Sequence, residues 1–290
     1  MQRMLLVGLA VLLGLYTPAR AQDLDGRAYR PGVDPNIDMY LCGWQDSLPR
    51  NTHGSLVERA IFTKGDPMKP ATKGAVLSYA GRFTHATLDR GDVTTPTTLE
   101  GEQEIMYVLT GNGVIEAGGS KYELFPDVCV LVPTNLRFTI AAGNDGPLTM
   151  YLVSDPVPAG FVPEKEIMLI DVNREPIRST DGHWCHIVKD IFNTQASYNP
   201  RIVKLGTIER VLTVALDPMS IAHPHSHGAG VEEVWAEVSG TSIAFVGKQI
   251  RMQPPGTAYM IPPDGRTPHA NINTSNEQVK FFYFARYGEQ

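Results

Sequence analysis

A cluster of histidines followed by a glutamate is the part of this sequence whose residue types and spacing could do chemistry. The run HPHSH occupies positions 223–227, and Glu233 follows six residues after His227. Residues i and i+2 of a strand point to the same face, so His225 and His227 can share one side of a sheet with Glu233. Imidazoles and a carboxylate together suit divalent transition metals. The pattern predicts one metal site, for Mn, Fe, Ni, Cu or Zn.

The side chains that follow Glu233 are candidates for a pocket beside this metal. If the strand continues, Trp235 and Glu237 point inward as Glu233 does. Glu237 could then act as a general base or support a histidine ligand, and the alternative is that twist or a bulge turns it to solvent. Trp235 is either a wall of the core or a platform for substrate, and Tyr259 and Arg266 are weaker pocket candidates.

The elements that must position these residues are predicted to be short strands. Runs of β-branched and aromatic residues are separated by Gly, Pro, Asn and Asp, and sustained helical periodicity is hard to find. The clearest runs in the second half are 211–216, 234–238, 241–246, 257–261 and 279–286. The chain has 290 residues and is 42% hydrophobic, so it is long enough to bury a substantial core.

An internal repeat divides the chain into two related units. Residues 53–62 resemble residues 183–192, and residues 104–111 resemble residues 233–240, at an offset of about 130 residues. A Pro-rich segment at 155–160 joins the units. We therefore expect an N-terminal arm over 22–52, a first barrel over 53–158 and a second, metal-binding barrel over 159–290.

The order of these residues resembles the two motifs of the cupin superfamily. His225-x-His227, Glu233 and Gly240 match the first motif. The second is matched by Gly256, Pro262, Gly265, His269 and Asn273. With the repeat, the sequence from about 45 to 287 resembles a bicupin, which implies an all-β fold of two double-stranded β-helix (jelly-roll) barrels in tandem. By motif position, the resemblance implies four metal ligands: His225, His227, Glu233 and His269.

The second unit departs from the family pattern in several places. Met219 stands where the family usually has Gly, and the gap from His227 to Glu233 is one residue longer than usual. Glu232 is therefore a rival ligand, although Glu233 keeps the six-residue spacing to the following Gly. The loop before His269 is also longer than usual. His223 is an extra imidazole, expected to lie beyond the rim of the barrel.

The first unit lacks most of the ligand set. The positions that correspond to the four ligands are Pro96, Thr98, Glu104 and Ile140. One carboxylate cannot hold a transition metal alone, so the first barrel is predicted to be metal-free, with a role in packing or in lining a pocket.

The N-terminus and the charge bear on the compartment and the partners. Arg3, an apolar run over 4–16 and Ala19-Arg20-Ala21 match a secretory signal peptide over 1–21, and the apolar run is too short to span a bilayer. The mature protein would be periplasmic or extracellular and not held in a membrane. A net charge of −6 without runs of Lys or Arg argues against a nucleic-acid partner.

Three cysteines are present in a chain expected to reach an oxidising compartment. Cys129 lies in a strand-like apolar run and is expected in the core. Cys42–Cys185 is then the only plausible disulfide, and the sequence cannot show whether the two residues meet.

The function implied is that of a metal-dependent enzyme on a small-molecule substrate. Three His and one Glu leave one or two metal positions open, as in catalytic sites. The leading hypothesis is a secreted mononuclear oxidoreductase of the oxygenase or oxidase type, acting on a small oxygen-rich or sugar-derived molecule. The alternatives are a redox-neutral lyase, isomerase or hydrolase, and a non-catalytic metal- or sugar-binding protein. The resemblance also leaves a homo-oligomer open.

Overall fold

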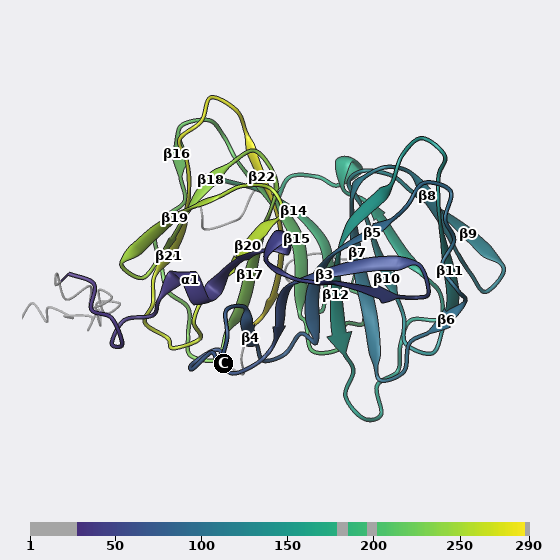
Figure 1. The fold of residues 1–290 in the computed structure, drawn as a ribbon, viewed down its shortest axis with the longest axis horizontal. Coiled ribbons are helices and arrows are strands. Elements are labelled where there is room, and N and C mark those ends of the chain that lie inside the picture. The colour runs from purple at the N-terminus through teal and green to yellow at the C-terminus, as the bar shows by residue number, and fades with distance from the viewer. Residues whose placement is uncertain (1–27, 179–184, 196–201, 288–290) are drawn as a thin grey trace, which may run out of the picture.

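The computed structural model describes residues 28–178, 185–195 and 202–287. The predicted signal peptide lies outside these residues. The predicted all-β fold is confirmed: four sheets form two barrels that lie side by side (Figure 1). Within the described ranges, helix is confined to α1 (Ile37–Tyr40) and two 3-10 turns, Trp44–Asp46 and Val172–Arg174. No helix in the described ranges is long and apolar enough to cross a membrane.

The second barrel is a sandwich of two sheets. The larger sheet has the order β14 (His186–Asn193), β15 (Arg210–Leu216), β22 (Val279–Arg286), β17 (Glu232–Ser239), β20 (Thr257–Met260) and β1 (Leu41–Gly43). The smaller sheet has the order β16 (Ser220–Ile221), β21 (His269–Asn273), β18 (Ser242–Val246) and β19 (Gln249–Gln253).

The first barrel repeats this arrangement. Its larger sheet has the order β13 (Met168–Asp171), β10 (Val128–Val132), β7 (Glu102–Thr110), β12 (Leu148–Pro156), β5 (Arg82–Leu88), β3 (Leu56–Lys64) and β2 (Pro49–Thr52), with β4 (Ala75–Leu77) parallel to β3. Its smaller sheet has the order β6 (Thr97–Thr98), β11 (Arg137–Ala142), β8 (Gly113–Ala117) and β9 (Ser120–Leu124).

The two barrels exchange edge strands. β1, from the predicted N-terminal arm, pairs with β20 of the second barrel, and Leu41 lies opposite Tyr259. β13, from the start of the predicted second unit, pairs with β10 of the first barrel, and Val128 lies opposite Asp171. Each barrel therefore completes its larger sheet with a strand that precedes the other barrel in the sequence.

Three apolar clusters hold the molecule together. One fills each barrel, and the third lies between the two larger sheets, where the barrels pack on each other. Side chains along β17 alternate between two of these clusters. Val234 and Ala236 belong to the cluster between the barrels, whereas Trp235 belongs to the cluster inside the second barrel. Residues of β17 that lie on the same face of the strand as Trp235 therefore point into the interior of the second barrel.

The three cysteines, all among the described residues, are unpaired. Cys129 is completely buried in the first barrel's sheet, as predicted for a core residue. Cys42 lies in the cluster between the barrels, and Cys185 packs against the interior of the second barrel. The Cys42–Cys185 bridge considered from the sequence is not formed.

Candidate metal centre

The structure brings three imidazoles together at one end of the second barrel. The ligand atoms of His225, His227 and His269 all lie within 4.8 Å of one another. His269 begins β21, and a two-way backbone bridge ties it to His225: His269 N donates to His225 O (2.8 Å), and His225 N donates to His269 O (3.2 Å). This bridge brings the 223–227 segment against the strand that carries the third histidine.

Glu233 completes the cluster from β17. Its Oε2 lies 2.8 Å from His227 Nε2, and its Oε1 lies 3.5 Å from His269 Nε2. The carboxylate is 2% exposed. Burial by itself would raise the pKa of Glu233, but the two imidazoles and the Trp235 N–H outweigh it and hold the pKa well below its usual range. Glu233 is therefore ionised and available as a ligand.

The hydrogen bonds of two histidines define which ring nitrogen faces the site. His225 Nδ1 lies 2.9 Å from the carbonyl oxygen of His223, which can only accept, so Nδ1 carries the proton. The Tyr259 hydroxyl donates to Asn271 Oδ1 (2.8 Å) and lies 3.2 Å from His269 Nδ1, which must then donate to it. Both rings keep the Nε2 lone pair for a metal.

This donor set fits a divalent transition metal. His227 Nε2 and His269 Nε2 are 3.2 Å apart. Two nitrogens bound to one metal at about 2.1 Å lie roughly 3 Å from each other, so the spacing needs little adjustment. Imidazole and carboxylate ligands accept Mn, Fe, Ni, Cu or Zn. The four residues named from the sequence motifs therefore form a site with the chemistry of a metal centre.

Hydrogen bonds from two neighbouring side chains hold the Glu233 carboxylate in place. Trp235 Nε1 donates to Glu233 Oε1 (2.5 Å), and the Tyr283 hydroxyl donates to Glu233 Oε2 (3.1 Å). Tyr283 also shares a hydrogen bond with the hydroxyl of Tyr287 (2.5 Å). Burial, and then the charge of Glu233, raise the pKa of both tyrosines, that of Tyr287 to about 12. Both tyrosines keep their protons at neutral pH.

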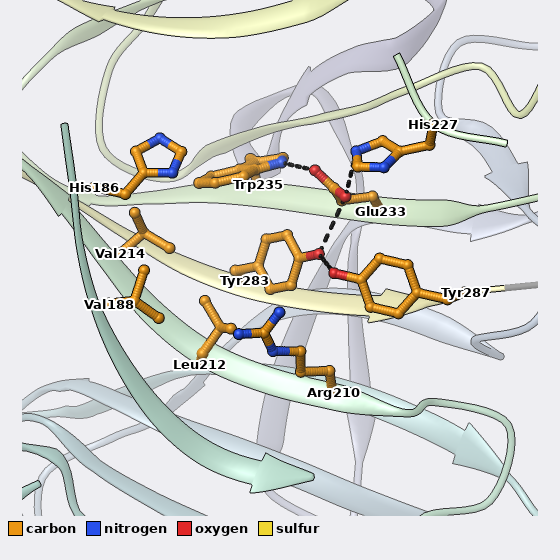
Figure 2. A pocket seen from close by; sticks show the side chains of 10 residues that line it. All are labelled: His186, Val188, Arg210, Leu212, Val214, His227, Glu233, Trp235, Tyr283 and Tyr287. Atoms are coloured by element: carbon orange, nitrogen blue, oxygen red, sulfur yellow. Dashed lines mark hydrogen bonds and ion pairs between the residues drawn. The ribbon is translucent and has the colours of Figure 1, made fainter. Parts of the chain in front are cut away.

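A small pocket opens beside this cluster (Figure 2). Its volume is about 40 Å³, and Glu233, His227 and Trp235 form one part of its wall. Strand β22 and the residue after it supply Tyr283 and Tyr287. The remaining wall comes from β14 and β15, which supply His186, Val188, Arg210, Leu212 and Val214. The pocket therefore has metal-ligand, aromatic, apolar and cationic parts.

Sequence reasoning missed Arg210, His186, Tyr283 and Tyr287. Arg210 immediately precedes the apolar run that was identified as a strand, and it has the parity of Leu212. Tyr283 lies directly opposite Trp235 in the sheet. The two-residue alternation along each strand indicates which residues face the interior of the barrel. The sequence does not show which strands lie next to β17.

Glu232, the rival ligand, faces away from the histidines. Its carboxylate accepts three backbone N–H groups from the first-barrel loop at 78–80, at 2.5, 2.9 and 2.9 Å. Burial raises the pKa of Glu232, and these donors oppose that rise. The structure thus uses Glu232 to join the two barrels and Glu233 to face the imidazoles.

The other sequence candidates lie outside the pocket wall. Glu237 is completely buried inside the barrel, four residues along β17 from Glu233, where it accepts from Ser242 Oγ (2.6 Å). Burial raises its pKa to about 9, so it holds a proton at neutral pH, and it does not contact the pocket where a general base would act. Tyr259 contacts His269 Nδ1 and does not line the pocket. Arg266 is exposed on a loop.

The corresponding carboxylate of the first barrel has different partners. Glu104 Oε1 lies 2.5 Å from Arg82 Nη2 and 3.3 Å from His53 Nε2. Arg82 also pairs with Glu58 and Glu102. In the first barrel, the Arg82 guanidinium therefore compensates the charge of Glu104. In the second barrel, two imidazoles contact the corresponding Glu233.

Comparisons with known proteins bear on the fold. No family model matches the chain, and no curated protein matches it. Among solved structures, it is similar to a Bacillus subtilis oxalate decarboxylase variant (14% identity, 89% of this chain and 80% of that chain, TM-score 0.62). It is also similar to a putative glyoxylate induced protein from Pseudomonas aeruginosa (8% identity, 91% and 95%, TM-score 0.66). A third similar structure is the Momordica charantia 7S globulin (10% identity, 87% and 85%, TM-score 0.61).

These neighbours include an enzyme and a globulin, so the likeness carries the fold and not a function. The oxalate decarboxylase and the globulin are cupin structures, and in all three comparisons four fifths or more of both chains are covered. The chain therefore has the tandem-barrel fold of the bicupins.

Proposed function

We propose that this protein is an exported mononuclear metal-dependent enzyme of the oxygenase or oxidase type, acting on a small oxygen-rich molecule. The observation that carries the proposal is the convergence of His225, His227, His269 and Glu233 on one point beside a pocket. Four protein ligands leave open positions on a five- or six-coordinate metal, as catalysis requires. A bound divalent metal would supply Lewis-acid or redox chemistry there.

The chain's own residues prepare the pocket for chemistry. Trp235 and Tyr283 hold both oxygens of Glu233, so the carboxylate has one orientation. The Tyr283 hydroxyl donates to that carboxylate and the Tyr287 hydroxyl donates to the Tyr283 oxygen, so the pair keeps two protons beside Glu233. Val188, Leu212 and Val214 exclude water from the opposite wall.

Export is the part of the proposal that depends on the sequence alone. The signal-peptide pattern over 1–21 supports a periplasmic or extracellular enzyme. Mass spectrometry of the protein from the exported fraction should find a chain that begins at Gln22. A full-length chain retained in the cytoplasm would contradict export and would leave the metal proposal standing.

A redox-neutral lyase, isomerase or hydrolase is the second candidate. The tyrosine pair favours it, because protonated hydroxyls beside a Lewis acid suffice for proton-transfer chemistry without dioxygen. One of the similar structures is an oxalate decarboxylase, which supports testing small acids under both hypotheses.

Elemental analysis followed by oxygen-electrode assays tests the proposal. Protein purified from its native compartment should carry one transition metal per chain and should consume dioxygen with a small oxygen-rich acid or sugar acid. Product formed without dioxygen uptake would favour the redox-neutral class. Stoichiometric metal with tight ligand binding and no product would make the protein a binding protein. No bound metal, or two metals per chain, would contradict the proposal.

A further inference from the structure

We propose that Tyr287, the residue after β22, is a positioning residue that orients two of the four candidate metal ligands. Its hydroxyl acts on Glu233 through Tyr283, and its ring acts on His227. The inference rests on the metal centre of the proposed function, because it assigns a role towards that centre to a residue that is not a ligand. Figure 2 shows the hydroxyls of Tyr283 and Tyr287 facing each other, with Glu233 and His227 on the same side of the pocket.

The hydrogen bonds between Tyr287 and Glu233 have one direction. Glu233 is ionised and can only accept, so the Tyr283 proton goes to Glu233 Oε2 (3.1 Å). Tyr283 has one hydroxyl proton, so in its bond with Tyr287 (2.5 Å) its oxygen accepts and the Tyr287 hydroxyl donates. Arg210 donates to the Tyr287 oxygen, because a guanidinium has only donors. The chain therefore runs from Arg210 through the two tyrosines to the carboxylate.

This chain acts on the carboxylate oxygen that lies nearest to a ligand nitrogen. Glu233 Oε2, which accepts from Tyr283, is also 2.8 Å from His227 Nε2. Hydrogen bonds in series polarise one another in a buried site, so a donor to the Tyr283 oxygen strengthens the bond from Tyr283 to Glu233. Removal of the Tyr287 hydroxyl would weaken that bond and loosen the carboxylate beside His227.

The ring of Tyr287 supports the histidine whose own hydrogen bonds restrain it least. The Nδ1 atoms of His225 and His269 are held by a carbonyl oxygen and by a hydroxyl. Within the described ranges, His227 has no such bond at Nδ1, and its side chain is 20% exposed. The Tyr287 ring meets the His227 ring edge to face, with centroids 6.3 Å apart and planes at 64°. This contact restricts rotation of the imidazole.

Tyr287 is itself anchored to the strand that borders β22. Its backbone N donates to Glu209 Oε2 (3.0 Å), and Glu209 Oε1 lies 3.2 Å from Arg286 Nη1. The backbone N of Glu209 donates to Ala285 O (2.9 Å), which continues the pairing of β15 with β22. The side chain of Tyr287 thus has a defined origin from which it can orient its neighbours.

The affinity for Zn²⁺, measured by chelator competition, tests the hydroxyl. Tyr283→Phe removes the direct donor to Glu233 and should weaken Zn²⁺ binding by about 10- to 100-fold. Tyr287→Phe removes the donor one step away and should weaken it by about 3- to 10-fold. The double variant should bind Zn²⁺ as Tyr283→Phe does, because the Tyr287 hydroxyl acts only through Tyr283. Tyr107→Phe is the matched control: it removes a tyrosine–carboxylate bond in the first barrel, to Asp127, and should bind as wild type does.

Tyr287→Leu tests the ring, because it removes the contact with His227 together with the hydroxyl. It should weaken Zn²⁺ binding by about 3- to 10-fold beyond Tyr287→Phe. This additional loss should persist when Tyr283 is replaced by Phe, since the ring contacts His227 directly. An additional loss that disappears in that background would overturn the assignment of the ring.

The outcomes separate this inference from the proposed function. One Zn²⁺ per chain with unchanged affinity in Tyr287→Phe overturns the inference and leaves the metal centre standing. Losses of the two single variants that multiply in the double variant also overturn it, because Tyr287 would then act independently of Tyr283. Wild type that binds no Zn²⁺ contradicts both. The expected coupling without dioxygen uptake by the metal-loaded enzyme supports the inference and contradicts the oxygenase type alone. If Tyr283→Phe fails to fold, the comparison of Tyr287→Phe and Tyr287→Leu with Tyr107→Phe decides.

Discussion

Glu232 and Glu233 are adjacent on β17, and their carboxylates bind on opposite faces of the same sheet. Glu232 accepts three backbone N–H groups from the loop at 78–80 of the first barrel. Glu233 lies 2.8 Å from His227 Nε2 inside the second barrel. Asp155 makes the reciprocal contact, since it accepts three backbone N–H groups from the second-unit loop at 206–208. One strand therefore serves the candidate metal site on one face and the junction between barrels on the other.

Exchanging each carboxylate for an amide should separate these two roles. Glu233→Gln should weaken metal binding, because the amide replaces an ionised ligand. Glu232→Gln should leave one metal per chain and should lower the free energy of unfolding by about 1–3 kcal/mol, because charge-assisted hydrogen bonds to the loop are lost. Chelator competition and urea unfolding of both variants measure the two effects. Equal losses of metal affinity would show that the assignment of the ligand is off by one residue.

The histidines can be tested with a control from the same run. His225→Ala and His269→Ala should each abolish stoichiometric metal binding. His223→Ala should bind metal as wild type does, because His223 contributes its backbone carbonyl to His225 Nδ1 and the substitution keeps that carbonyl. Elemental analysis of dialysed protein measures the difference. If both ligand variants retain stoichiometric metal, the assignment of the metal site to this barrel is wrong.

Tyr259 is expected to act on the metal through His269. Tyr259→Phe removes the hydroxyl that lies 3.2 Å from His269 Nδ1, so the ring loses the partner that sets its tautomer. Loss of such a partner typically costs about 10- to 100-fold in metal affinity. Tyr151→Phe is the control, because it removes another buried hydroxyl that donates to a backbone carbonyl, that of Glu237. Similar metal affinities in the two variants would argue against this role of Tyr259.

Glu237 should make stability depend on pH. Its pKa is about 9 in the folded protein, against an ordinary value of 4.5, so the folded state binds the proton more tightly between these values. Its contribution to stability is complete below pH 4.5 and is lost as the pH rises towards 9. At pH 7 the cost of keeping the proton is about 3 kcal/mol, and Glu237→Gln should remove it.

Urea unfolding at pH 5, 7 and 9 measures this effect. The difference in stability between Glu237→Gln and wild type should grow in favour of the variant as the pH rises, and metal content should stay near that of wild type. A constant difference across this range would mean that Glu237 is ionised in the folded protein. A large loss of turnover with normal metal content would instead support the catalytic role considered from the sequence.

The sequence by itself determined the features that depend on local periodicity and on the repeat. The two-residue alternation along β17 placed Glu233, Trp235 and Glu237 on one face, because a strand's side chains alternate whatever packs around it. The offset of about 130 residues identified two related units. The spacing of the motif residues identified the imidazoles and the carboxylate that the structure brings together.

Only the tertiary structure decided what faces those residues. The loop that receives Glu232 lies more than 150 residues away, and β1 pairs with a strand of the second barrel that lies more than 210 residues further along the chain. Arg210, on another strand, reaches the pocket because β15 and β17 both border β22. Periodicity specifies which way a side chain points on its own strand, whereas register and strand order specify its neighbours, and those depend on packing of the whole chain.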